Sequence, residues 1–232
     1  MGVLGHSSRM DFSLTEDQRL FSDSVQGFAE RYLAEGALAR AHAGTFPWDI
    51  AKLMAEHGLL GITIAEADGG QGGDLMDAII ATERIASVCP RSADVLQFGS
   101  FGPIRVLAEY GSDEQKSRVL AKLLAGEALI AVAMTESDAG SAVTDLRTTA
   151  TPDGDGFRIN GSKVFTSHGP EADFFLTYVR FGPGVGGIGS VLIERAADGF
   201  SNGKPTRYMS GDEWTPLFFD NLYVGPENVL LG

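Results

Sequence analysis

The sequence predicts an α+β fold, in which a helical N-terminal domain is followed by a β-barrel or β-sandwich domain. In the first half of the chain, apolar residues recur at three- and four-residue spacing between capping signals, as in amphipathic helices. After Gly126, short runs of β-branched and aromatic residues alternate with glycine-rich turns, as in strands. We therefore expect a helical domain over residues 10–126 and a β domain over residues 127–232.

Five helices are expected in the first domain. Ser13-Leu14-Thr15-Glu16 has capping-box spacing, and apolar residues then follow on one helical face as far as Tyr32. A second helix should begin near Pro47 and end at His57-Gly58, because glycine favours the position after a helix. The other three are expected from Leu75 to Pro90, from Val95 to Tyr110 and from Ser112 to Gly126.

Five short strands are expected in the second domain. Asp153-Gly-Asp-Gly156 lies between two of them and is typical of a hairpin turn. The glycine-rich segment Gly182–Gly189 is predicted to be a mobile surface connection. The expected strands are Leu129–Met134, Leu146–Thr151, Phe157–Ile159, Phe174–Val179 and Val191–Glu194.

Composition and charge limit the function classes open to the chain. The 232 residues are 44% hydrophobic, which suffices for packed cores. The formal net charge of -13 would repel nucleic-acid phosphates and anionic lipid, so we expect neither nucleic-acid binding nor binding to a membrane surface. We expect no membrane insertion, because no apolar run approaches the roughly 20 residues needed to span a bilayer. The single cysteine, Cys89, cannot form an internal disulfide, and we predict a cytoplasmic protein. Residues 1–9 lack the apolar core of a signal peptide and are interpreted as a leader or a cloning scar.

Two segments of the β domain concentrate hydroxyl groups. Met134-Thr-Glu-Ser-Asp-Ala-Gly-Ser141 leaves an expected strand with uncharged donors and a glycine, which suits a phosphate or the edge of a flavin. Asn160–Gly169 supplies a turn, a strand with Phe165, and a second pair of hydroxyls. Ordinary turn formation is the alternative for the first segment, and core packing is the alternative for Phe165.

These two segments resemble motifs of the acyl-CoA dehydrogenase family. The first, with Thr148-Thr-Ala150 after it, is similar to the family's Thr-Glu-Pro-x-x-Gly-Ser-Asp and Thr-x-Ala. The second is similar to Asn-Gly-x-Lys followed by aromatic-Ile-Thr-Asn-Gly. Three more segments match family motifs in order, so the resemblance covers Met10–Gly232. They are Leu59–Gly72, Tyr110–Lys116 and Phe219–Gly232.

The resemblance implies a bound FAD. The strand ending at Thr135 would pass along the flavin ring, with the Thr135 hydroxyl at its polar edge, and Ser141 would lie near the pyrophosphate and the CoA arm. Phe165 would pack on the flavin face away from substrate, and Ser167 would contact the N5 region. Such hydrogen bonds stabilise charge on reduced flavin. The cofactor-binding residues predicted in this way are Val132, Ala133, Met134, Thr135, Gly140, Ser141, Phe165, Thr166 and Ser167.

The activity implied by the resemblance is oxidation of an acyl-CoA thioester to the 2,3-enoyl-CoA, in fatty acid metabolism. Hydride would pass to the flavin while a base removes the alpha proton. The implied partners are the acyl-CoA substrate and electron-transfer flavoprotein or another acceptor, within a homo-oligomer or hetero-oligomer. Ser141, Val95, Phe98 and Gly99 would approach the substrate, with helix packing as the alternative for the last three. No metal site is predicted.

The sequence also departs from the family pattern. Ser137 replaces a proline and Ala142 an aspartate, so the first loop is expected to be less rigid and to lack one polar anchor. The family's C-terminal four-helix domain, which supplies the catalytic glutamate, is not matched. We therefore leave the base unassigned and expect the chain alone to be inactive. A structural role is favoured for Glu136, and no chemical role for His168.

Two alternative functions remain open. The same fold and FAD could support monooxygenase or desulfinase chemistry, which only the unmatched domain would distinguish. The chain could also be a non-catalytic subunit or fragment that needs a partner chain to supply the helical bundle.

Overall fold

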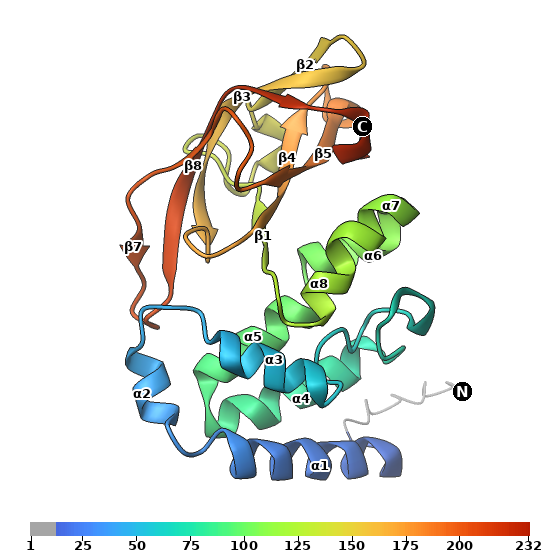
Figure 1. Cartoon of the computed structure of the whole chain (residues 1–232), viewed down its shortest axis with the longest axis vertical. Coiled ribbons are helices and arrows are strands. Elements are labelled where there is room, and N and C mark those ends of the chain that lie inside the picture. Colours follow the sequence, from blue (N-terminus) through green and yellow to red (C-terminus); the bar gives the residue numbers. More distant parts are fainter. Residues whose placement is uncertain (1–12) are drawn as a thin grey trace, which may run out of the picture.

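The computed structural model describes residues 13–232, so the expected leader lies outside the described residues. It confirms the α+β organisation, with helices in the lower half of Figure 1 and strands in the upper half, joined through β1 (Ile130–Ala133). The helices are α1 (Glu16–Tyr32), α2 (Ala37–His42), α3 (Trp48–Glu56), α4 (Leu75–Val88), α5 (Pro90–Ser100), α6 (Pro103–Tyr110), α7 (Asp113–Gln115) and α8 (Ala121–Leu124).

The starts of two predicted helices differ from the expectation. The capping box of α1 is formed by Thr15 and Gln18, because their side chains and backbone amides exchange hydrogen bonds of 3.2 and 3.0 Å. The prediction of one helix from Val95 to Tyr110 is wrong. α5 and α6 are separate, each begins with proline, and Gly102 between them has a φ of 63°. The short helix α2 was not predicted.

The last predicted helix is confirmed and ends at a glycine. α7, a π-helical turn (Lys116–Leu120) and α8 follow one another without a break. Gly126 then adopts a φ of 65°, and a Cβ built on it would lie 2.6 Å from the backbone of Ala51 in α3. Only glycine meets both conditions at this position.

The strands form one mixed sheet with the order β6-β8-β3-β2-β4-β5-β9, in which β1 pairs parallel to β4. The longest pairing is antiparallel, between β3 and β8, and it has bulges near Gly161 and Val164. The five predicted strands do not include β6–β9. The strands after β1 are β2 (Thr149–Asp153), β3 (Gly156–Ser167), β4 (Phe174–Arg180), β5 (Ile188–Glu194), β6 (Phe200–Asn202), β7 (Thr206–Arg207), β8 (Glu213–Val224) and β9 (Val229–Leu231).

Two expectations about the loops of the sheet are corrected or refined. The turn expected at Asn160 is wrong, because β3 continues through it as a bulged strand paired with β8. The segment Gly182–Gly189 is held by Arg180, whose guanidinium donates to the carbonyls of Gly182 and Gly184 at 3.3 and 2.9 Å.

An apolar cluster joins the two halves. It brings residues of α6, the π-helical turn and α8 against β1, β4, β5 and β9, so the helices and the sheet share one interface. Its buried members are Ile64, Ile104, Leu107, Val119, Leu120, Leu123, Ile130, Phe174, Leu176, Leu192 and Leu230. No helix between residues 13 and 232 is both long and apolar enough to cross a membrane.

Candidate functional site

A cleft of about 240 Å³ lies between the helices α5–α6 and the sheet. Three of the predicted cofactor residues, Val132, Phe165 and Ser167, meet there with the predicted substrate residue Phe98. No titratable side chain lines this cleft among the residues described. The complete lining is Gln97, Phe98, Phe101, Gly102, Pro103, Val132, Phe165 and Ser167.

Two apolar side chains of the sheet face open space in this cleft. Val132 is 41% exposed and Phe165 is 56% exposed, although both lie at the edge of a packed core. Phe165 has a φ of 58°, and its ring lies 4.7 Å from that of Trp214. The alternative of core packing for Phe165 is therefore excluded, and the two side chains leave an apolar surface on which a flat ring can pack.

The loop after β1 lies beside the second hydroxyl segment. The carbonyl of Thr135 accepts a hydrogen bond from Val164 N at 2.8 Å, which holds Thr135 next to the strand that leads to Phe165. Gly140 and Ser141 are exposed, and a Cβ on Gly140 would meet nothing within 4 Å. A ligand can approach the main chain closely here.

The hydroxyls of Thr135, Ser141 and Ser167 form no side-chain hydrogen bond with any residue between 13 and 232. None of these three residues is buried. Each can therefore donate to a ligand without breaking an existing bond.

Two other predicted cofactor residues point their side chains away from the cleft. Ala133 is fully buried and Thr166 is 1% exposed, because successive residues of a strand face opposite sides. Contact between these residues and a cofactor would use the backbone. The hydroxyl of Thr166 is buried without a partner in the described part of the chain.

A buried ion pair connects the two hydroxyl segments. Lys163 Nζ, which is fully buried, donates to Glu136 Oε1 at 2.8 Å and to the carbonyl of Met134 at 3.0 Å. The Glu136 carboxylate also accepts from the amides of Arg147 and Thr148, at 2.6 and 2.9 Å. Both carboxylate oxygens thus accept hydrogen bonds, and Glu136 is not among the residues that line the cleft.

The ionisation of this pair follows from its surroundings. Burial opposes the charge on Glu136, but hydrogen bonds from Lys163 and Thr148 outweigh it, so the pKa of Glu136 lies below its ordinary value. Burial lowers the pKa of Lys163, and the Glu136 carboxylate offsets part of that change. The sequence motif contained both residues, but nothing in it indicated that Lys163 would be buried.

The predicted substrate residues of α5 line two different cavities. Val95 and Gly99 do not line the cleft; they line a small apolar cavity of about 20 Å³ between the helices and residues 128–130 at the start of β1. A Cβ on Gly99 would lie 2.6 Å from Leu60 Cδ2, so this glycine allows the Leu60 side chain to pack closely against α5. Phe98 lines both spaces and forms a wall between them.

Sequence reasoning missed four residues of the cleft lining, namely Gln97, Phe101, Gly102 and Pro103. The spacing of Phe98 and Phe101, three residues apart, could have indicated that both face one side. The break between α5 and α6 instead places Phe101 outside either helix.

The residues present fit a flavin. An exposed aromatic and an exposed valine offer a surface for a planar ring, and unpartnered hydroxyls stand in the two adjoining segments. A flavin bound there would supply an acceptor for hydride. The fold and the cleft thus define a two-domain protein of the flavoprotein class, with the cleft at the junction of helices and sheet.

Comparison with known proteins identifies a family of the same two-domain organisation. The family models "Acyl-CoA dehydrogenase, N-terminal domain" and "Acyl-CoA dehydrogenase, middle domain" match residues 15–127 and 131–222. The short-chain-specific acyl-CoA dehydrogenase of Clostridium acetobutylicum is 33% identical over 225 residues, which are 95% of this chain and 59% of the relative. The chain therefore belongs to the acyl-CoA dehydrogenase family, and it spans about 59% of the length of this relative.

Solved structures agree in fold. Butyryl-CoA dehydrogenase from Megasphaera elsdenii superposes with a TM-score of 0.83 and 29% identity, covering 96% of this chain and 60% of that one. The FAD complex of PigA superposes with a TM-score of 0.88 and 26% identity, covering 95% and 59%.

Proposed function

We propose that this chain forms the flavin-binding part of an enzyme that oxidises an acyl-CoA thioester to the 2,3-enoyl-CoA. The observation that best supports the proposal is the cleft, where Val132, Phe165 and Ser167 from the sheet face Phe98 from α5. Relatives named for short-chain acyl-CoA and butyryl-CoA dehydrogenation support the substrate class.

FAD is the proposed cofactor, and this chain's residues have separate tasks toward it. Thr135 and Ser167 would donate hydrogen bonds to the edge of the ring, and Phe165 and Val132 would pack on it. The exposed Gly140 and Ser141 would face the phosphates, where close backbone approach is needed. Ala133 and Thr166 have buried side chains, so only their backbone atoms would contact the cofactor.

The base and the partners are further parts of the proposal. Because the cleft has no titratable side chain from the described residues, we propose that a segment or subunit beyond them supplies the base. Acyl-CoA would be the substrate and electron-transfer flavoprotein the acceptor. A homo-oligomer and a cytoplasmic location are proposed from exposed apolar residues of α4, Leu75, Met76 and Ile79, and from the single buried Cys89.

The test uses the full-length protein reconstituted with FAD and supplied with straight and branched acyl-CoA esters. We expect the purified protein to retain flavin absorbance. Under anaerobic conditions, adding substrate should bleach this absorbance, and enoyl-CoA should be the product. Absence of bound flavin after reconstitution, or flavin that no acyl-CoA bleaches, would show that the proposed function is wrong.

A further inference from the structure

His168 follows the cleft residue Ser167 and is wedged between the two domains. Its ring is only 2% exposed and packs edge-on against two aromatic residues of the helical domain. The ring centroids lie 4.6 Å from Phe98, with an interplanar angle of 89°, and 5.4 Å from Phe46, with an angle of 79°. Through Phe98, the ring supports the helical wall of the cleft.

The backbone of His168 is strained and firmly held. Its φ is 54°, a conformation that non-glycine residues seldom adopt and that the surrounding structure must enforce. The amide donates to the carbonyl of Glu213 at 2.8 Å, and the carbonyl accepts from the amide of Ala172 at 2.8 Å. Arg195 then fixes the rest of the loop, because its guanidinium donates to the carbonyls of Gly169 and Ala172, both at 2.7 Å.

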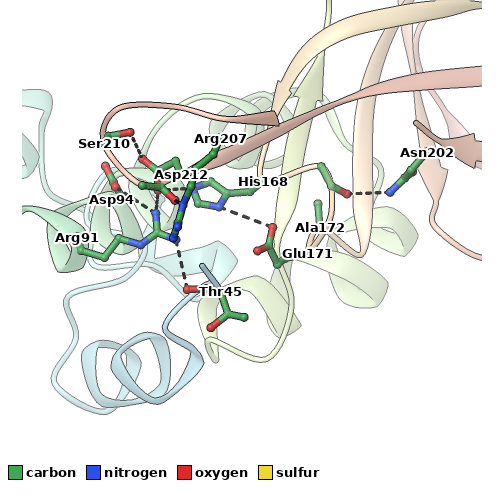
Figure 2. A network of polar contacts seen from close by, with 12 residues as sticks. Thr45, Arg91, Asp94, His168, Glu171, Ala172, Asn202, Arg207, Ser210 and Asp212 are labelled. Carbon is green, nitrogen blue, oxygen red and sulfur yellow. Dashed lines mark hydrogen bonds and ion pairs between the residues drawn. The ribbon is translucent and has the colours of Figure 1, made fainter. Parts of the chain in front are cut away.

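Two carboxylates lie close to the ring at distances longer than a hydrogen bond, and Figure 2 marks these two contacts with dashed lines. Asp212 Oδ1 lies 3.8 Å from Nε2, and Glu171 Oε2 lies 4.0 Å from Nδ1. The buried Arg91 of α5 pairs with Asp212, with Asp94 at 3.7 Å and with the carbonyl of Thr45 at 3.3 Å. Burial, followed by the charge of Arg91, lowers the pKa of His168 to about 4, so the ring is neutral near pH 7.

We propose that His168 is a positioning residue, whose ring couples the hydroxyl of Ser167 to the α5 wall at Phe98 and so sets the width of the cleft. The adjacent residue on the sheet side is predicted to touch the flavin, and the contact on the helix side forms the opposite wall. The inference rests on the proposed function as far as the flavin and the acyl chain are concerned. The ring contacts themselves exist without either ligand.

Two substitutions separate ring packing from backbone strain. His168→Asn removes the ring, while asparagine tolerates a positive φ better than most residues. His168→Phe keeps an aromatic ring, and Phe165, three residues earlier, shows that a phenylalanine can adopt a φ as positive as 58°. The matched control is His57→Asn, because the ring of His57 packs on Phe28 at 5.0 Å and on Tyr32 at 5.2 Å, away from the cleft.

The experiment measures hydrogen exchange without cofactor, the reduction potential of bound FAD, and kcat/KM in the full-length protein. We expect His168→Asn to speed exchange in both residues 95–103 and 165–169, to shift the potential, and to lower kcat/KM roughly ten- to hundredfold, as expected for misplacement near 1 Å. His168→Phe should restore all three towards the wild-type values. His57→Asn should speed exchange only around α1 and α3.

Three results would overturn the proposal. One is unchanged exchange in residues 95–103 for His168→Asn, which would show that the ring does not support the wall. The second is a His168→Asn variant that loses thermal stability but keeps the wild-type reduction potential and kcat/KM. The third is a His168→Phe variant that does not return the exchange rates, the reduction potential and kcat/KM towards the wild-type values. If the wild-type protein binds no flavin, the proposed function fails, and the exchange measurement still decides the role of His168.

Discussion

Thr135 and Ser167 have hydroxyls that no other described residue binds, so their substitution tests the cofactor site with little effect on packing. We expect Thr135→Val and Ser167→Ala each to lower the flavin reduction potential and turnover. A hydrogen bond to a charged acceptor contributes about 1.5–3 kcal/mol, which corresponds to a roughly ten- to hundredfold effect. Redox titration and steady-state kinetics measure it, with Thr151→Val on the exposed face of β2 as the control. Native rates combined with a lower melting temperature would contradict the assignment.

The Lys163–Glu136 pair is a buried ion pair that joins the two hydroxyl segments. Lys163→Met leaves the Glu136 carboxylate without its cation, which should cost about 3–5 kcal/mol of unfolding free energy. Lys163→Met/Glu136→Gln should recover part of the loss, because no unpaired charge is then buried. Urea denaturation measures both, and Arg147→Met in the exposed pair with Asp138 should change the midpoint little. A double variant no more stable than the single one would argue against the ion-pair explanation.

His168 gives the protein a specific dependence on pH. Its folded-state pKa of about 4 lies below the ordinary 6.5, so the unfolded chain takes up a proton first as the pH falls. The free energy of unfolding should therefore decrease between pH 6.5 and about 4, by on the order of 3 kcal/mol, with no effect above that window. His168→Phe should remove this part of the dependence. Denaturation curves at several pH values compare the two, and parallel curves would contradict the prediction.

At the level of elements, α7 is joined to the end of the sheet by one side chain. Gln115 is the N3 residue of a capping box, and its Nε2 also donates to the carbonyls of Glu227 and Val229 at 2.9 and 3.0 Å. Gln115→Ala leaves these groups unpaired and should cost about 1–3 kcal/mol. Gln18→Ala is the matched control, since Gln18 occupies the same capping position in α1 without cross-domain bonds. Equal losses in urea denaturation would show that the bonds across the interface contribute nothing.

Elements with local signals could be predicted from the sequence. Helix α3, with proline before it and glycine after it, and strand β4, a run rich in aromatic and β-branched residues, were both predicted. β6–β9 could not be predicted, because they are short or partly polar and are defined by partners far away in sequence. The break at Gly102 was also missed, since an isolated glycine does not by itself reveal a left-handed conformation.

The site could be predicted only where a motif fixed its residues. The hydroxyl segments resembled the family in spacing, and Val132, Phe165 and Ser167 do meet in one cleft. Three features of the site depend on tertiary packing. They are the burial of Lys163, the packing of His168 between the two domains, and the position of Gln97 and Phe101 in the cleft lining. Residue spacing along the chain contains no information about those contacts, because each depends on segments that lie far apart in the sequence.

The whole molecule should lack dehydrogenase turnover when it consists of these 232 residues alone. Removal of an alpha proton needs a base within about 2.6–3.2 Å, directly or through one water, and the described residues place none in the cleft. The purified chain is incubated with FAD, acyl-CoA esters and an artificial electron acceptor, beside the full-length protein. Clear turnover by the short chain would contradict the prediction, and Glu136 would be the first residue to replace.

The pairing of β3 with β8 also has a consequence for synthesis. A nascent chain leaves the ribosome N-terminus first, so the helices emerge while the strands that close the sheet are still untranslated. Phe165 and Ser167 lie on β3, whose partner β8 is made much later, and the carbonyls that Gln115 binds come later still. The growing polypeptide therefore exposes an unpaired β3 edge, with its aromatic, during translation. Because the cleft surface carried by β3 depends on its pairing with β8, we expect that surface to form only after residue 224 has emerged.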